Sequence, residues 1–128
     1  MIEEAVAARM LAFPALSGLI VQRLFPLVIP QDMALPAVAY QKIDSPKTSS
    51  HSGRSDLARS RFQFTCAAET YAGVKALAAE VVNCWWGYRG TIGGVRIDGS
   101  LVENDSDGGA VLEGDNVVTI DVVIWHSE

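Results

Sequence analysis

The sequence predicts an α+β fold: a mainly antiparallel sheet of about four strands, with one long helix and N-terminal helical cover on one face. The first indication is Thr70–Gly87, where apolar residues recur at helical spacing. The second is that the segments on either side alternate apolar and polar side chains, as half-buried strands do. The third is the length of 128 residues, which suits a single domain, 1–128, with its own core.

The N-terminal residues predict the helical cover. Ile2–Phe13 has apolar residues at helical spacing and two glutamates in its first turn, where the helix dipole favours carboxylates. Pro14 interrupts this pattern, and Ala15–Val21 adds a short helical turn. Arg23–Leu27 is then extended, and Pro26 confines it to a sheet edge because proline has no N–H to donate.

The long helix should pack its apolar stripe against the sheet. Thr70 can cap the first turn through its hydroxyl, and Gly87 can take the left-handed conformation that ends a helix. The stripe consists of Val74, Leu77, Ala78, Val81 and Trp85. Trp86 lies beside it, and either packs under the N-terminal helix or anchors a subunit interface, where tryptophan is enriched.

Four segments predict strands, and we expect them in the sheet order Ala37–Asp44, Arg61–Ala68, Val117–Trp125 and Val95–Val102, which keeps each neighbouring pair antiparallel. Ser100 should face outward. The side chains expected to face the helix are Val38, Tyr40, Phe62, Phe64, Ile97, Leu101, Ile120 and Val122.

The remaining segments predict connections. Pro30–Pro36 and Gly87–Gly94 read as a loop and a glycine-rich turn. Ser45–Ser60 is polar and long for a hairpin connection, so we expect it to be mobile in the free subunit. Glu103–Asn116 is a second long polar loop and is acidic.

Composition excludes several classes of protein. Hydrophobic residues make up 49% and charged residues 20% of the chain, an apolar balance that suggests surface buried against other subunits. The net charge of −5 gives no general electrostatic reason to bind nucleic acid or an anionic membrane. No apolar run reaches the roughly 18 to 20 residues that span a bilayer, and the acidic N-terminus does not resemble a secretory signal. We therefore expect assembly in the cytoplasm.

No residue pattern predicts catalysis, a cofactor or a metal site. Cys66 and Cys84 fall on predicted buried faces and are expected to be reduced core thiols, and a disulfide between them would require their two elements to touch. His51 and His126 have no ligand-spaced partners. The segment beginning at Glu103 resembles half of a calcium-binding loop, but its twelfth position is a glycine, so we expect a solvated loop and no calcium effect on melting.

The chain resembles the tail completion, or tail-to-head joining, proteins of long-tailed (siphovirus-type) bacteriophages and prophages. The resemblance covers nearly the whole chain, and its strength lies in the order and spacing of the motifs. Those motifs are Phe13-Pro14-Ala15-Leu16, Arg23-Leu24-Phe25-Pro26, Leu35-Pro36-Ala37-Val38-Ala39-Tyr40, Tyr71-Ala72, Gly90-Thr91-Ile92-Gly93-Gly94-Val95-Arg96-Ile97, and Trp125 closing the last strand.

The resemblance implies a structural virion protein rather than an enzyme. Such proteins form a ring, typically of six copies, at the head-proximal end of the tail, end polymerisation of the tail tube and meet the head connector. Partners would be other copies of the chain, the tail tube protein and the head connector protein. Two alternatives remain: another phage connector or minor tail protein, and a small bacterial enzyme or ligand-binding domain.

Two segments of opposite charge suggest how copies meet. Lys42–Arg61 contains five basic and two acidic residues, and Glu103–Asn116 contains five acidic and no basic residues. Because a ring contact joins two different surfaces of the same chain, the basic segment of one subunit is expected to face the acidic segment of the next. The alternative is that both are solvated or meet another tail protein. With Trp86, the interface candidates are Lys47, Arg54, Arg59, Asp105 and Asp107.

Overall fold

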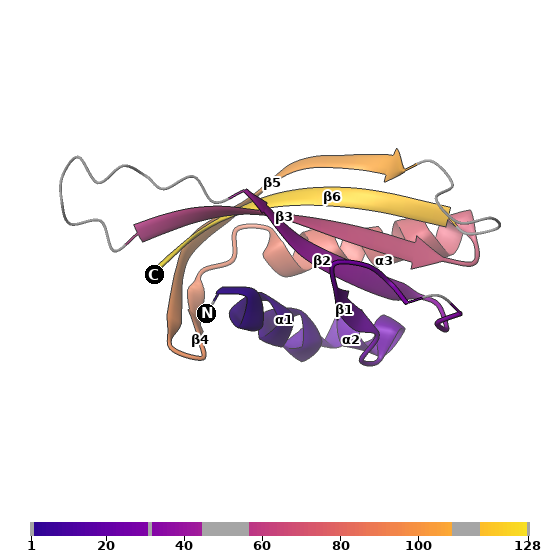
Figure 1. Ribbon diagram of the computed structural model, residues 1–128, viewed down its shortest axis with the longest axis horizontal. Helices are drawn as coiled ribbons and strands as arrows, with labels where there is room; N and C mark the ends of the chain where they lie inside the picture. The colour runs from indigo at the N-terminus through magenta and orange to yellow at the C-terminus, as the bar shows by residue number, and fades with distance from the viewer. Residues whose placement is uncertain (1, 31, 45–56, 109–115, 128) are drawn as a thin grey trace.

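A computed structural model describes residues 2–30, 32–44, 57–108 and 116–127 of the chain. The described part contains three helices and six strands, arranged so that the helices lie against one face of a curled sheet (Figure 1). In chain order the elements are α1 (Ile2–Ala12), α2 (Pro14–Ile20), β1 (Leu24–Pro26), β2 (Ala37–Asp44), β3 (Leu57–Ala68), α3 (Tyr71–Trp85), β4 (Gly90–Ile92), β5 (Val95–Gly108) and β6 (Asn116–Ser127).

The sheet corrects the predicted fold class. Its six strands lie in the order β1-β2-β3-β6-β5-β4, and the sheet is mixed because β1 runs parallel to β2. The expected sheet of about four antiparallel strands is therefore wrong in strand number and in type. The edge strands β1 and β4 have three residues each, too few to show a repeat of two. The predicted order of the four inner strands is confirmed.

Two strands also continue further than their sequence pattern indicated. The strand β3 starts at Leu57, inside the segment expected to be a loop up to Ser60, and β5 runs on to Gly108, inside the expected acidic loop. The extension of β5 from Glu103 to Gly108 is polar and charged, and that of β3 is Leu57-Ala58-Arg59-Ser60, so neither shows the alternating apolar repeat that marks a half-buried strand. Backbone pairing with β6 extends both strands regardless, from Leu57 to Ala68 and out to Gly108. The other part of the predicted mobile loop lies outside the described residues.

The core lies between the sheet and the three helices. Val74, Leu77 and Val81 of α3 are fully buried, as predicted, and Thr70 caps the helix by accepting a hydrogen bond from the Gly73 N–H at 2.9 Å. Three buried aromatic rings form the centre of the core and are contributed by two elements: Phe62 and Phe64 of β3, and Trp85 of α3.

The face of β5 was predicted wrongly beyond Ile97. The pairing of β5 with β6 shifts by one residue between Ile97 and Gly99, which marks a β-bulge. Because side chains alternate along a strand, this shift exchanges the two faces. Leu101 is 47% exposed, whereas the Ser100 hydroxyl accepts from the Tyr88 N–H at 3.0 Å and donates to the Trp85 carbonyl.

An arginine holds the N-terminal helix against the end of α3. The Arg9 guanidinium donates two hydrogen bonds to the Cys84 carbonyl, with N–O distances of 3.0 and 3.3 Å. The same group stacks on the Tyr88 ring, 3.9 Å from its centroid, and lies 5.2 Å from the centroid of Phe13. Arg9 thereby satisfies a carbonyl at the helix C-terminus, where backbone acceptors lack partners and positive charge is favoured.

Candidate assembly surfaces

The two cysteine thiols lie in the interior of the fold. Cys66 and Cys84 are free and buried, as predicted, and burial raises the pKa of their thiols to about 12 and about 11. The Arg9 side chain opposes this rise in the pKa of Cys84 without cancelling it. Because the thiolate is the reactive form of cysteine, both groups act as packed apolar side chains at neutral pH.

One buried polar pair was missed by the sequence analysis. The Ser60 hydroxyl lies 2.8 Å from His126 Nε2, and His126 Nδ1 lies 2.7 Å from the Ser127 carbonyl oxygen. The carbonyl oxygen can only accept, so Nδ1 donates to it and the Ser60 hydroxyl bonds to the other ring nitrogen. Ser60 is fully buried and His126 is 5% exposed, so this pair ties β3 to β6 in the interior. Their separation of 66 positions in the sequence left no local signal.

Metal and membrane sites find no support in the described part of the chain. Its His, Cys, Asp and Glu side chains form no group of three or more that could hold a metal ion. Among the same residues, no helix has the length and apolar character needed to cross a bilayer. Glu103, the first residue of the calcium-like pattern, forms an ion pair with Arg61, and the part of the pattern up to Gly108 belongs to strand β5.

Three of the candidate interface residues, Arg59, Asp105 and Asp107, lie in strands of the sheet. Lys47 and Arg54 lie outside the described residues. Arg59 is half-buried in β3, with its backbone opposite Trp125. Asp105 and Asp107 belong to β5, where their backbones pair with Ile120 and Val118, so they lie in a strand and not in a hairpin loop.

Trp86 is the most exposed large apolar side chain of the described residues. It directly follows α3 and is 69% exposed, so it does not pack under the N-terminal helix. Gly87 follows with a φ of +65°, the left-handed conformation expected of a residue that ends a helix. An exposed indole of this size is the kind of side chain that anchors protein interfaces.

The basic and acidic segments also meet within one subunit. Arg61 of β3 reaches across β6 to form an ion pair with Glu103 of β5, and lies 4.0 Å from the carboxylate of Asp121. Gln63 donates to the same aspartate at 3.4 Å. Part of the charge predicted to act between subunits therefore holds β3, β6 and β5 together on the outer face of the sheet.

A second group of exposed apolar side chains flanks β1 along the chain. Val21, Leu27 and Val28 are 59%, 65% and 68% exposed. Val21 and Leu27 have φ angles of +58° and +71°, which residues with a side chain rarely adopt. Backbone strain of this kind persists where surrounding structure enforces it, and it concentrates at functional sites.

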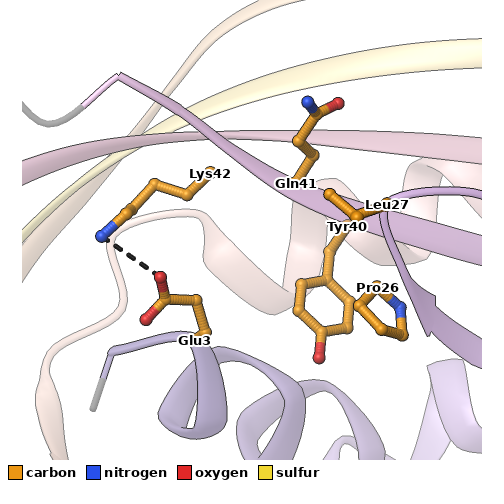
Figure 2. A pocket seen from close by; sticks show the side chains of 6 residues that line it. All are labelled: Glu3, Pro26, Leu27, Tyr40, Gln41 and Lys42. Carbon is orange, nitrogen blue, oxygen red and sulfur yellow. Dashed lines mark ion pairs between the residues drawn. The ribbon is translucent and has the colours of Figure 1, made fainter.

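A shallow pocket opens beside β1 (Figure 2). It is lined by Glu3, Pro26, Leu27, Tyr40, Gln41 and Lys42. The Lys42 ammonium lies 3.2 Å from the Glu3 carboxylate and connects β2 to α1. Burial raises the pKa of the Glu3 carboxyl, but a backbone hydrogen bond and Lys42 outweigh burial and hold the pKa below its usual value. The pocket wall thus combines the apolar side chains of Pro26 and Leu27 with the ion pair between Glu3 and Lys42.

Comparison with known proteins decides between these interpretations. The family model described as tail completion protein gp17 matches residues 4–125. The chain belongs to the tail completion protein gp17 family. The resemblance inferred from the sequence is confirmed, and the chain is a structural protein of the bacteriophage tail and a component of the virion. No curated protein matches the chain in sequence.

Solved structures share the fold of this family member. A chain in the virion of a native gene transfer agent particle superposes with a TM-score of 0.82 at 18% identity, over 98% of this chain and 94% of that chain. A second solved chain gives a TM-score of 0.63 at 16% identity, over 99% of this chain and 94% of that chain. At such identities the likeness establishes the fold alone.

Proposed function

We propose that this tail completion protein forms a closed ring of identical subunits, six in number, at the head-proximal end of the tail. The ring ends polymerisation of the tail tube and presents a surface to the head connector. The observation that carries this proposal is the family match over residues 4–125. The gene transfer agent virion, which contains a chain of the same fold, supports a place in a particle of this kind.

The arrangement of the sheet supports a head-to-tail contact between subunits. The strand ends at Asp44 and Leu57, which flank the basic part of the chain, lie at one end of the sheet. The strand ends at Gly108 and Asn116, which flank the acidic part, lie at the opposite end. A ring contact joins two different surfaces of one chain, and such surfaces must face different neighbours. Exposed charge pairs contribute only about 0 to 1 kcal/mol each, so they would guide assembly while apolar side chains such as Trp86 supply the affinity.

The ring is tested by the mass and shape of the assembled protein. Purified chain, alone and added to tail tubes, is examined by electron microscopy and native mass spectrometry. The proposal predicts rings whose mass is six times that of the subunit. A chain that remains monomeric in both preparations would contradict the proposal.

The charge arrangement is tested by a swap. Arg54→Glu with Arg59→Glu should impair ring formation, and adding Asp105→Lys with Asp107→Lys should partly restore it. High salt should weaken both effects through screening. A ring that assembles unchanged with the two glutamates at low salt would show that these charges do not meet across the boundary between subunits.

A further inference from the structure

Strand β5 leaves a long sheet edge open. Within the described residues, β4 pairs only with Val95–Ile97, so the outer edge of β5 from Asp98 to Gly108 has no neighbouring strand. At the other side of the sheet, β1 pairs only with Val38–Tyr40, which leaves the edge of β2 open from Gln41 to Asp44. Open edges present unpaired N–H and C=O groups and are templates for pairing with another chain.

The two open edges lie at the same level of the sheet. Backbone pairing runs from Asp44 to Arg61, from Arg61 to Val123 and from Val123 to Leu101. The line across the sheet that begins at the open part of β2 therefore ends at the open part of β5. A second copy placed beside the first, with its sheet continuing at this level, brings these two edges together.

The strand directions fit such a continuation. In the order β2-β3-β6-β5 every neighbouring pair is antiparallel, so β2 and β5 run in opposite directions. Rotation about an axis parallel to the strands keeps the strand directions of the neighbouring copy unchanged. The β2 of that neighbour therefore runs antiparallel to the β5 of the first copy. Antiparallel pairing is the more stable type per residue.

An exposed apolar side chain is present at each of these edges. Ile43 of β2 is 46% exposed, and it lies at the bulge where pairing with β3 shifts between Lys42 and Asp44. Leu101 of β5 is 47% exposed, on the face that its own bulge turned outward. Both side chains lie at the level of the pairing from Asp44 through Arg61 and Val123 to Leu101. Contact between copies at this level would remove both from water.

The charge of the open β5 edge favours pairing with β2 over pairing with a second β5. Asp98–Gly108 contains four acidic and no basic residues, a formal charge of −4. Two β5 edges would oppose like charges, which destabilises strand pairing. The stretch Gln41–Asp44 contains one lysine and one aspartate and is formally neutral, and the chain that follows it is basic. The open β2 edge therefore suits β5, and a second β5 does not.

From these observations we infer that the open β2 edge of one copy pairs antiparallel with the open β5 edge of the next, so that the sheet continues from subunit to subunit. This inference rests on the proposed ring and specifies its contact. It is an alternative to the charge-swap hypothesis, because sheets that continue side by side keep the strand ends at Asp44 and Gly108 at opposite ends, and Ile43 and Leu101 then form the contact.

The test is a disulfide between the two edges. The double variant Ile43→Cys with Leu101→Cys is oxidised with copper phenanthroline, both as purified chain and in purified tails, and analysed on non-reducing gels. The native Cys66 and Cys84 are buried and do not compete. The pairing predicts a ladder of covalent oligomers that ends at the ring mass and collapses on reduction.

Matched controls separate this contact from others. Leu11→Cys with Tyr71→Cys places two exposed thiols on the helical layer, at 38% and 54% exposure, and should give no ladder. Leu101→Cys alone should stay monomeric on the gel, and a dimer from it would show β5 pairing with itself and contradict the inference. Rings without a ladder in the double variant would overturn the edge pairing and leave the proposed ring intact. A chain monomeric in both preparations would overturn both.

Discussion

The substitution Phe64→Ala removes the middle ring of the aromatic stack in the core. Phe64 is fully buried, and its ring centroid lies 6.3 Å from that of Phe62 and 6.2 Å from that of Trp85, with interplanar angles of 14° in both cases. Truncating a buried phenylalanine to alanine costs about 3 to 5 kcal/mol, because the cavity left behind closes only in part. Two lost ring contacts, each contributing about 0.5 to 1.5 kcal/mol, place the expected cost in the upper half of this range.

Urea unfolding of the monomer measures this cost. The midpoint should fall at an unchanged slope, by an amount equivalent to about 4 to 5 kcal/mol, which is a large share of the roughly 5 to 15 kcal/mol by which domains are stable. Leu101→Ala is the matched control, because the sequence placed Leu101 on the same inner face and the structure exposes it. This variant should lose less than about 1 kcal/mol. Equal losses in the two variants, or a loss below about 1 kcal/mol for Phe64→Ala, would refute the assignment of the core.

Three further substitutions test other contacts. Thr70→Ala removes the N-cap of α3 and should lower the free energy of unfolding by about 1 kcal/mol, whereas Thr70→Ser should not. Arg9→Lys loses the paired hydrogen bonds to Cys84 and the stacking on Tyr88, and should cost about 1 to 2 kcal/mol; an unchanged urea midpoint would show that the contact is dispensable. Because the folded thiols keep protons that unfolded thiols lose above about pH 8.5, stability should fall as pH rises from there towards 11, and Cys66→Ala should make this decline shallower.

The inner strands could be predicted because apolar side chains recur at every second position. Residues 61–66 alternate polar and apolar side chains without a break, and Val118, Ile120, Val122 and Ile124 follow the same spacing, whereas the helix stripe that begins at Val74 repeats at the spacing of an α-helix. Each pattern reflects burial of one face, which is a local property of the element. The cap at Thr70 and the left-handed Gly87 were predicted for the same reason, since capping depends on neighbouring residues.

Several of the errors arise from contacts between residues that are distant in the sequence. The bulge between Ile97 and Gly99 reverses the face of Leu101, and only the alignment of β5 with β6 reveals it. The contacts of Arg9 with α3 and of Ser60 with His126 join positions 75 and 66 residues apart, and no local pattern marks them. The open edges result from the unequal lengths of neighbouring strands. Backbone pairing sets these lengths, and the side-chain pattern does not indicate them.

The most direct test of the proposed function is the length of tails assembled without this protein. In the phage that carries the gene, particles from a deletion strain and from the complemented strain are compared by electron microscopy. A ring that ends tube polymerisation and joins tail to head predicts tails of long and variable length, separate from filled heads, with normal particles restored by complementation. Tails of normal length attached to heads in the deletion strain would contradict the proposal.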